Sequence, residues 1–217
     1  MKKTERVKII IKRLEETYPE TPIPLDHQND FTLLVAVALS AQSTDKKVNE
    51  LTKELFKVAS SAEEMFKLGE KKIYIHIKQL GLAKTKAKNI FKLSKIIFEK
   101  YNNKIPNTFK ELESLPGVGH KTAGVVMSQA FGIPAFPIDT HIHRLSQRWG
   151  LTSGKNVNQT EIDLKRLFPK NLWNKLHLQI IFYGREYCSA RGCNGTICRL
   201  CKELYPSRNK PVICLKA

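Results

Sequence analysis

Two segments of helical periodicity meet at Leu115-Pro116-Gly117-Val118-Gly119. Proline removes a backbone donor and glycine permits a left-handed backbone, so neither helix can continue through this stretch. Because the two glycines carry no side chains, backbone N–H groups at the start of the second helix can approach an anion closely. The stretch predicts a tight turn between helices that binds a phosphate, with a plain turn between packed helices as the alternative.

The rest of the chain also repeats at helical spacing. Val7, Ile10 and Leu14 form one apolar stripe, and residues 31–39 are apolar almost all round, which is typical of a buried central helix. In residues 73–80, apolar and polar side chains alternate in part as they do in a strand. A helix that ends at Gly81 is nevertheless the favoured prediction. There is no convincing pair of strands, no internal repeat and no low-complexity linker. The sequence therefore predicts an all-α fold.

The charge balance favours a polyanionic partner. The 217 residues include 37 Lys and Arg against 20 Asp and Glu, a formal net charge of +17. Such an excess is typical of proteins that bind nucleic acid, although a solvated basic surface would also produce it. One stretch, 84–104, contains Glu99 as its only acidic residue and seven lysines, which are expected on the exposed face of a helix: Lys84, Lys86, Lys88, Lys92, Lys95, Lys100 and Lys104.

The apolar runs are too short for a membrane protein. The longest, 33–39, has seven residues, whereas a membrane helix needs about 20. The basic residues Lys12 and Arg13 interrupt the first apolar segment, so no signal peptide is predicted. We expect no membrane partner and a cytoplasmic protein, associated with the nucleoid if the source is bacterial.

The cysteines are clustered near the end of the chain. Cys188, Cys193, Cys198 and Cys201 lie within 14 residues, and Cys214 follows. Because disulfides are rare in a reducing compartment, this cluster suggests a metal site.

Several motifs, in this order along the chain, resemble the endonuclease III family of helix-hairpin-helix DNA glycosylases. They are residues 39–45, 81–87, 115–123, 138–144 and the cysteine cluster. The hairpin sequence alone also occurs as a passive DNA grip in polymerases and ligases, so the assignment depends on the combination of motifs. The resemblance covers nearly the whole chain. It implies a two-lobed all-α fold, with a six-helix lobe at 23–133 ending in the hairpin and a second lobe that pairs 1–22 with 134–217.

The resemblance also implies the activity and its nucleophile. Lys121 is expected to attack C1′ of a damaged nucleotide, release an oxidised pyrimidine from duplex DNA, and leave a Schiff base that undergoes β-elimination 3′ to the abasic site. An amine suits this chemistry because it is a nucleophile that forms imines, and the positive end of a helix favours loss of its proton. Taken alone, Lys121 would be interpreted as a phosphate-binding lysine.

Asp139 is the second catalytic residue that the resemblance implies. It would stabilise the cationic sugar and help deprotonate Lys121, and its position also predicts a helix N-cap. Two alternatives remain open: a monofunctional glycosylase, whose relatives lack the lysine, and a non-enzymatic helix-hairpin-helix module that only binds DNA.

The remaining site residues are expected to contact DNA. When a base leaves the duplex, another group must fill the space that it leaves in the base stack. The resemblance implies that the Gln42 and Leu82 side chains enter this space. Without the resemblance, Leu82 would be a helix-end contact and Gln42 a surface amide. Five more residues are expected at the DNA: Gly117, Gly119, His120, Thr122 and Thr140. His141 and His143 are expected to point to different sides of a helix and not to bind metal. The predicted partner is duplex DNA with a damaged base or an abasic site, bound by a monomer.

The resemblance implies a [4Fe–4S] cluster at the cysteines. The gaps of four, four, two and twelve residues depart from the family's spacing. Cys188 matches the first ligand and Cys198 with Cys201 the close pair, which leaves Cys193 or Cys214 as the fourth. Cys193 is favoured because a compact loop orders fewer residues. A zinc site and no metal at all are the alternatives.

Overall fold

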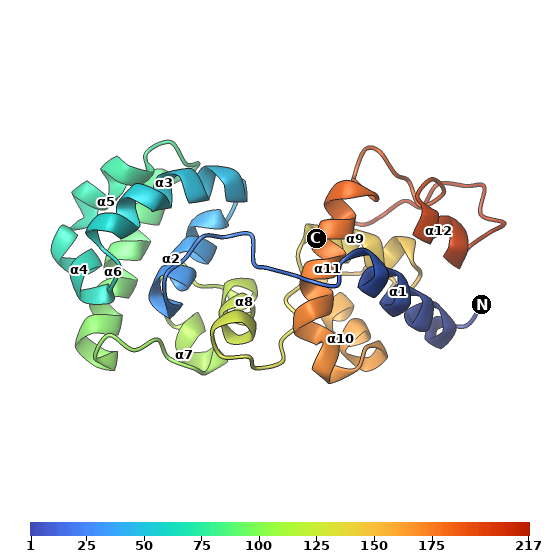
Figure 1. Ribbon diagram of the computed structural model, residues 1–217, viewed down its shortest axis with the longest axis horizontal. Helices are drawn as coiled ribbons and strands as arrows, with labels where there is room; N and C mark the ends of the chain where they lie inside the picture. The colour runs from blue at the N-terminus through green and yellow to red at the C-terminus, as the bar shows by residue number, and fades with distance from the viewer. The chain divides into compact units, whose positions relative to one another are not determined.

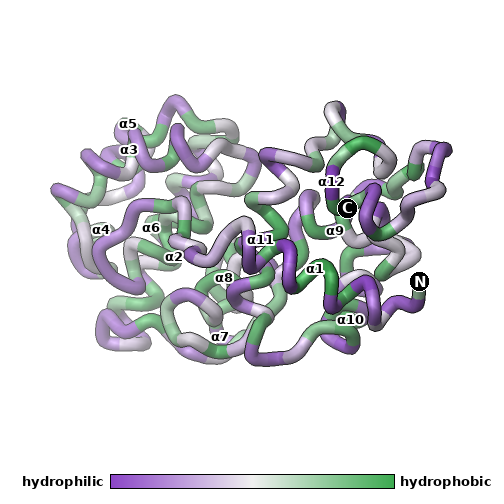
Figure 2. Tube along the Cα trace, turned by 45° about the vertical axis from the view of Figure 1, so that its right-hand side comes forward, coloured by the Kyte–Doolittle hydropathy of each residue, from purple (hydrophilic) through white to green (hydrophobic).

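The computed structural model describes residues 1–217 and contains helices but no strands. The all-α prediction is confirmed. The chain forms two compact units, one of residues 23–133 and one that combines 1–22 with 134–217 (Figure 1). Hydrophobic and hydrophilic residues alternate along the helices of both units (Figure 2), as expected when each helix buries one face. None of the helices combines the length and apolar character that a membrane span requires.

The unit of residues 23–133 is built from seven helices, one more than the six expected when the five-residue α7 is counted. They are α2 (Asp30–Ser40), α3 (Asp45–Val58), α4 (Ala62–Leu68), α5 (Glu70–Ile77), α6 (Ala83–Tyr101), α7 (Phe109–Glu113) and α8 (His120–Ala130).

Helix α2 is the centre of this unit. Nine consecutive residues, 31–39, are buried, as the apolar run predicts. Asn29 begins the helix because its side chain accepts a hydrogen bond from the backbone N–H of Thr32. Helices α3, α6 and α8 pack around α2. One core therefore holds three connecting segments: the loop before α3, the loop before α6 and the turn before α8.

Residues 70–77 form a helix, which settles the ambiguity between helix and strand. In α5, Ile73 and Ile77 are fully buried, whereas Ile75 is exposed. A strand would have placed all three on one face. The four-residue spacing of Ile73 and Ile77, which is the spacing of a helix, therefore predicts correctly which side chains are buried.

The second unit holds the N-terminal helix and the C-terminal part of the chain. Its elements are α1 (Lys3–Thr17), α9 (Thr140–Arg148), α10 (Val157–Leu167), the short 3-10 helix η1 (Lys170–Leu172), α11 (Trp173–Glu186) and α12 (Arg199–Leu204). Helix α1 contacts α10, α11 and α12, and fully buried residues such as Ile10, Leu14 and Trp149 form the core. Helix α12 is absent from the sequence-based prediction because its six residues carry too short a periodic pattern.

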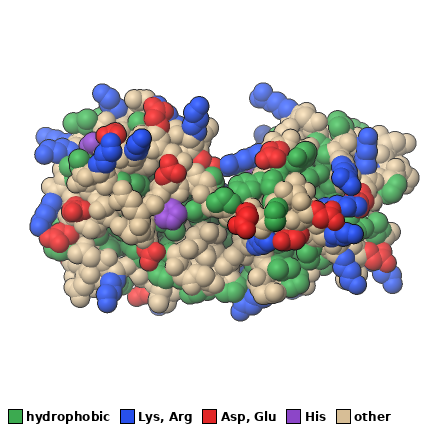
Figure 3. Space-filling view, in the orientation of Figure 1, with side chains coloured by type: hydrophobic (Ala, Val, Ile, Leu, Met, Phe, Trp, Pro, Cys, Tyr) green, Lys and Arg blue, Asp and Glu red, His purple; other side chains and the backbone are tan.

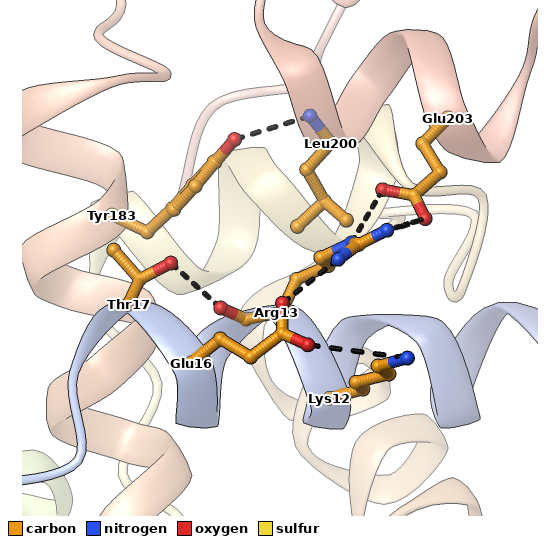
Figure 4. Close-up of polar contacts among 7 residues, drawn as sticks. All are labelled: Lys12, Arg13, Glu16, Thr17, Tyr183, Leu200 and Glu203. Carbon is orange, nitrogen blue, oxygen red and sulfur yellow. Dashed lines mark hydrogen bonds and ion pairs between the residues drawn. The ribbon is translucent and has the colours of Figure 1, made fainter.

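Two polar contacts fasten α12 to the rest of this unit (Figure 4). The Arg13 guanidinium on α1 donates to both carboxylate oxygens of Glu203 at 2.8 Å, and this ion pair holds the pKa of Glu203 below its usual range. The Tyr183 hydroxyl accepts a hydrogen bond from the backbone N–H of Leu200 at 3.2 Å. These contacts fix the last turn of the chain segment that carries the clustered cysteines.

Candidate functional site

The predicted hairpin is present between α7 and α8. Leu115 and Val118 are buried and anchor the turn, while Gly117 has a φ of +81°. A Cβ atom at Gly117 would lie 2.9 Å from Nδ2 of Asn89 on α6. Both the left-handed backbone and the close packing therefore require glycine here.

Gly119 does not use the left-handed backbone that glycine permits. Its φ is −94° and its ψ 176°, an extended conformation that any residue can adopt, and a Cβ built on it would meet no atom within 4 Å. The protein itself therefore does not require glycine at this position. Gly119 is the N-cap of α8 and provides no side-chain cap, so its bare backbone leaves room for an anion at the helix start.

Lys121 lies in the first turn of α8 and is exposed. Its neighbour His120 contacts α7: His120 Nδ1 lies 2.7 Å from Glu113 Oε1, and the ring stacks on Phe109. Thr122 is half-buried. The hairpin therefore presents Lys121 to the outside, while His120 also holds the two helices together.

Gln42 and Leu82 have the same unusual backbone. Their φ values are +55° and +58°, and both side chains are exposed, Leu82 by 61%. For a residue with a Cβ atom this conformation costs on the order of 1–3 kcal/mol. Leu82 directly precedes α6, and Gln42 lies in the turn between α2 and α3. Strained, exposed residues of this kind are typical of functional sites.

Asp139 caps α9, as predicted. Its Oδ1 accepts a hydrogen bond from the backbone N–H of Ile142 at 2.8 Å, and the residue is only 9% exposed. The carboxylate therefore lies at the start of α9, the positive end of the helix dipole. Lys121 belongs to the unit of residues 23–133 and Asp139 to the other unit.

The residues after Asp139 make separate contacts. His141 Nδ1 lies 3.2 Å from Arg144 Nη2, and burial lowers the pKa of His141. His143 is buried and contacts the Thr160 hydroxyl of α10 at 2.9 Å. The two histidines thus point to different sides, as predicted. Thr140 is exposed. It lines a cavity of about 360 Å³ on α9 together with the end of the chain: Thr140, His143, Arg144, Cys214, Leu215, Lys216 and Ala217.

Four cysteines gather in the second unit. The sulfur atoms of Cys188, Cys193, Cys198 and Cys201 all lie within 4.8 Å of one another, and all four residues are buried. Cys214 stands outside this group, where its Sγ lies 3.6 Å from the carbonyl oxygen of Arg144. The compact loop therefore brings Cys193 to the other three thiols.

Two arginines of α9 hold the loop that begins at Cys188. Arg148 donates to the Cys188 sulfur at 3.2 Å and to the carbonyl oxygen of Ser189 at 2.9 Å, and Arg144 donates to the carbonyl oxygen of Cys188 at 3.1 Å. Sequence reasoning assigned neither arginine a role. Their four-residue spacing places them on one helix face, but no local signal shows that this face is buried against the cysteines.

The chemistry of the thiols fits a metal or iron–sulfur centre. Hydrogen bonds from the Cys188 and Cys201 thiols lower the pKa of Cys198. The bond to Cys198 raises the pKa of Cys188, and bonds with Cys188 and then Cys198 raise the pKa of Cys201. The group thus stabilises a thiolate, the form of cysteine that binds metal. The positive charge of Arg148 beside Cys188 further favours an anionic centre. The residues present therefore fit a [4Fe–4S] cluster held by four cysteines.

Comparisons with known proteins agree on one family. Residues 35–170 match the family model described as HhH-GPD superfamily base excision DNA repair protein. The chain is 41% identical to endonuclease III of Bacillus subtilis over 203 residues, which are 92% of this chain and 93% of that protein. It is also 41% identical to endonuclease III of Escherichia coli K12, over 88% of this chain and 90% of that protein.

Solved structures show the same similarity. A trapped endonuclease III–DNA covalent intermediate matches with a TM-score of 0.87 and 37% identity, covering 92% of this chain and 94% of that chain. A non-covalent endonuclease III–DNA complex matches equally well. A thermostable thymine-DNA glycosylase shares the fold, with a TM-score of 0.79 at 21% identity over 90% of this chain and 94% of that chain.

Proposed function

This chain belongs to the endonuclease III family, within the HhH-GPD superfamily of base excision DNA repair proteins, and we propose that it excises oxidised pyrimidines through a Schiff base on Lys121. It is a DNA N-glycosylase that also cleaves the strand as an AP lyase. The observation that carries the proposal is the exposed amine of Lys121, directly after a hairpin whose Gly119 leaves the start of α8 open.

Lys121 supplies the nucleophile. Its neutral amine attacks C1′, and the base leaves with the electrons of the glycosidic bond and takes up a proton. The sugar ring opens to an imine on Lys121 Nζ. Loss of a proton from C2′ then expels the 3′ phosphate, and water releases the enzyme. A lysine amine suits both steps, since it forms the covalent bond and afterwards withdraws electrons as an iminium.

Asp139 supplies the negative charge. Its cap bond to Ile142 fixes the orientation of the carboxylate. The negative charge helps Lys121 to lose its proton and stabilises positive charge on the sugar as the base departs. A fixed charge costs no reorganisation during the reaction, so it acts mainly on the transition state.

The hairpin and the two strained turns act on the DNA itself. The backbone at Gly117 and Gly119 and the start of α8 bind a phosphate, and His120, Thr122 and Thr140 make further contacts. Leu82 enters the stack as an apolar wedge, and Gln42 pairs with the base left without a partner. Their exposure and strained backbone support this role.

The four clustered cysteines, Cys188, Cys193, Cys198 and Cys201, hold the [4Fe–4S] cluster of the family, and Cys214 is not a ligand. When bound, the cluster cross-links a loop that has little apolar core of its own. Arg148 and Arg144 orient that loop against α9, whose other end is Asp139. We propose that the protein works as a monomer. We also propose that it acts in the cytoplasm on nucleoid DNA, because it carries a +17 net charge and its similar relatives include bacterial proteins.

Borohydride reduction tests the proposal because it converts a Schiff base to a stable amine. We expect the wild-type protein to give a covalent adduct with a duplex that carries an oxidised pyrimidine, and Lys121→Gln to give none. The matched control, Lys110→Gln on the exposed part of α7, should crosslink normally. Crosslinking and nicking by Lys121→Gln would show that another amine is the nucleophile. Excision without any adduct in the wild type would favour a monofunctional glycosylase.

A further inference from the structure

Lys86 is buried where the sequence predicts an exposed lysine. The residue is only 8% exposed, and burial lowers the pKa of its amine. Its Nζ donates a hydrogen bond to the Ser43 hydroxyl at 2.9 Å. Burying an ammonium group is unfavourable even when it is hydrogen-bonded, so a solvated lysine would cost the fold less. The position therefore suggests a task other than stability.

The contacts of Lys86 join two turns of the chain. Its side chain binds Ser43, the residue after Gln42. Its backbone N–H makes the first hydrogen bond of α6, to the carbonyl oxygen of Leu82 at 2.9 Å, so the side chain starts one helical turn behind Leu82. The two turns also lie close together, since a Cβ atom added to Gly81 would be 3.8 Å from the carbonyl oxygen of Gln42. One residue thus binds the turns that present both Gln42 and Leu82.

Both turns need such support. Gln42 and Leu82 hold a left-handed backbone although both carry a Cβ atom, and both side chains are exposed. Strained conformations persist only where the surrounding structure determines them. An exposed side chain provides little packing of its own, so the support must come from contacts beneath the turns.

Lys86 also faces the hairpin. A small cavity of about 20 Å³ lies between α2, α6 and the turn, and is lined by Ala38, Leu39, Lys86, Asn89, Ile90 and Gly117. Gly117 packs against Asn89, one helical turn after Lys86. The first two turns of α6 therefore connect the Gln42 and Leu82 turns with the phosphate-binding hairpin.

We propose that Lys86 is a positioning residue that keeps the Gln42 and Leu82 turns together, so that both side chains enter the duplex as one unit. The inference rests on the function proposed for these two residues. Without the bond from Lys86 to Ser43, each turn would relax separately, and the nucleotide would leave the stack more slowly.

Base displacement can be measured apart from catalysis. The probe is a duplex with 2-aminopurine beside a non-cleavable abasic analogue, whose fluorescence rises when side chains enter the stack. We expect Lys86→Met and Ser43→Ala each to slow this rise about tenfold. Lys86→Arg, which can still reach Ser43, should restore it, and the double variant should be no slower than either single variant, because both remove the same bond. Lys57→Met, at an exposed lysine of α3, is the control.

A second assay separates positioning from loss of folding. Single-stranded DNA with an abasic site needs no insertion, so Lys86→Met and Ser43→Ala should nick it at the wild-type rate while losing excision from duplex DNA. An equal loss on both substrates, or an unchanged fluorescence rise in both variants, would overturn the inference. A wild-type protein that displaces the base but neither excises nor nicks would instead contradict the proposed function.

Discussion

Asp139 has one structural contact and one proposed catalytic role on the same carboxylate. Its Oδ1 accepts the hydrogen bond that starts α9, whereas the role that we propose in the reaction depends on its negative charge. Asparagine caps helices as well as aspartate does, so the two roles can be separated by a single substitution. The residue is therefore suited to a test in which the fold is preserved.

We expect Asp139→Asn to bind abasic-site DNA nearly as tightly as the wild type and to lose excision by about 100-fold or more, because the charge acts in the transition state. Fluorescence anisotropy measures the binding, and single-turnover kinetics measure the excision. Asn156→Asp, the converse change at the N-cap of α10, should keep full activity. Full excision by Asp139→Asn would remove Asp139 from the catalytic residues.

At the scale of an element, the two glycines of the hairpin meet different structural requirements. Gly117 is required by its positive φ and by Asn89, whereas Gly119 is extended and faces open space. Substitution by alanine should therefore separate folding from DNA binding within three residues of chain.

Gly117→Ala should lower the free energy of unfolding by at least about 1–2 kcal/mol, because alanine is strained in a left-handed backbone. Gly119→Ala should leave that free energy within about 0.5 kcal/mol of the wild type, yet weaken DNA binding about tenfold, since its Cβ would stand where a phosphate approaches. Denaturant titration and anisotropy measure the two effects. Unchanged DNA affinity of Gly119→Ala would mean that the start of α8 does not bind phosphate.

The cysteine loop is a second element, and its metal content can be predicted from the positions of the thiols. Protein purified without oxidation should be brown and contain iron and sulfide, whereas zinc would leave it colourless. Cys193→Ser should lose the cluster and loosen the unit around α12, and Cys214→Ser should stay brown, because Cys214 lies outside the group.

Iron and sulfide analysis, together with absorption spectra, measures the cluster content of the Cys193→Ser and Cys214→Ser variants. Cys198→Ser is the reference for loss of the cluster, because Cys198 and Cys201 are the two closely spaced ligands. Iron kept in Cys193→Ser but lost in Cys214→Ser would reverse the assignment. Full metal content in both variants would show that four of these five cysteines do not build the site.

On the face drawn in Figure 3, the positively charged side chains are spread out and do not form one patch. Figure 3 shows Lys and Arg side chains around the rim of the unit of residues 23–133, with Asp and Glu side chains between them. Net charge by itself therefore predicts attraction to DNA but not which surface meets it.

Binding should depend steeply on salt, with a log–log slope of about −0.9 for each phosphate contact. Lys84→Ala or Lys88→Ala should make the slope shallower by about one contact, because both lysines are exposed at the start of α6 close to Leu82. Lys57→Ala should leave the slope unchanged. A slope unaffected by either α6 substitution would place this end of the lysine-rich stretch away from the DNA.

Local patterns in the sequence predicted the features that depend on neighbouring residues. Periodicity identified α2 as a buried helix and α5 as a helix, and side-chain chemistry identified the Asp139 cap and the turn at Gly117. Each of these follows from contacts within about one helical turn, where spacing along the chain is also distance in space.

Features that depend on residues far apart in the chain follow from the packing of the helices against one another. The tertiary structure turned Lys86 inward to Ser43 and set Arg148 against Cys188, and neither contact was expected from the sequence. It also placed Cys193, which the compact loop favours, beside the other three thiols. In each case the periodic pattern allows several partners. Packing of separate helices selects one, because a buried charge or thiol must find its partner within hydrogen-bond distance.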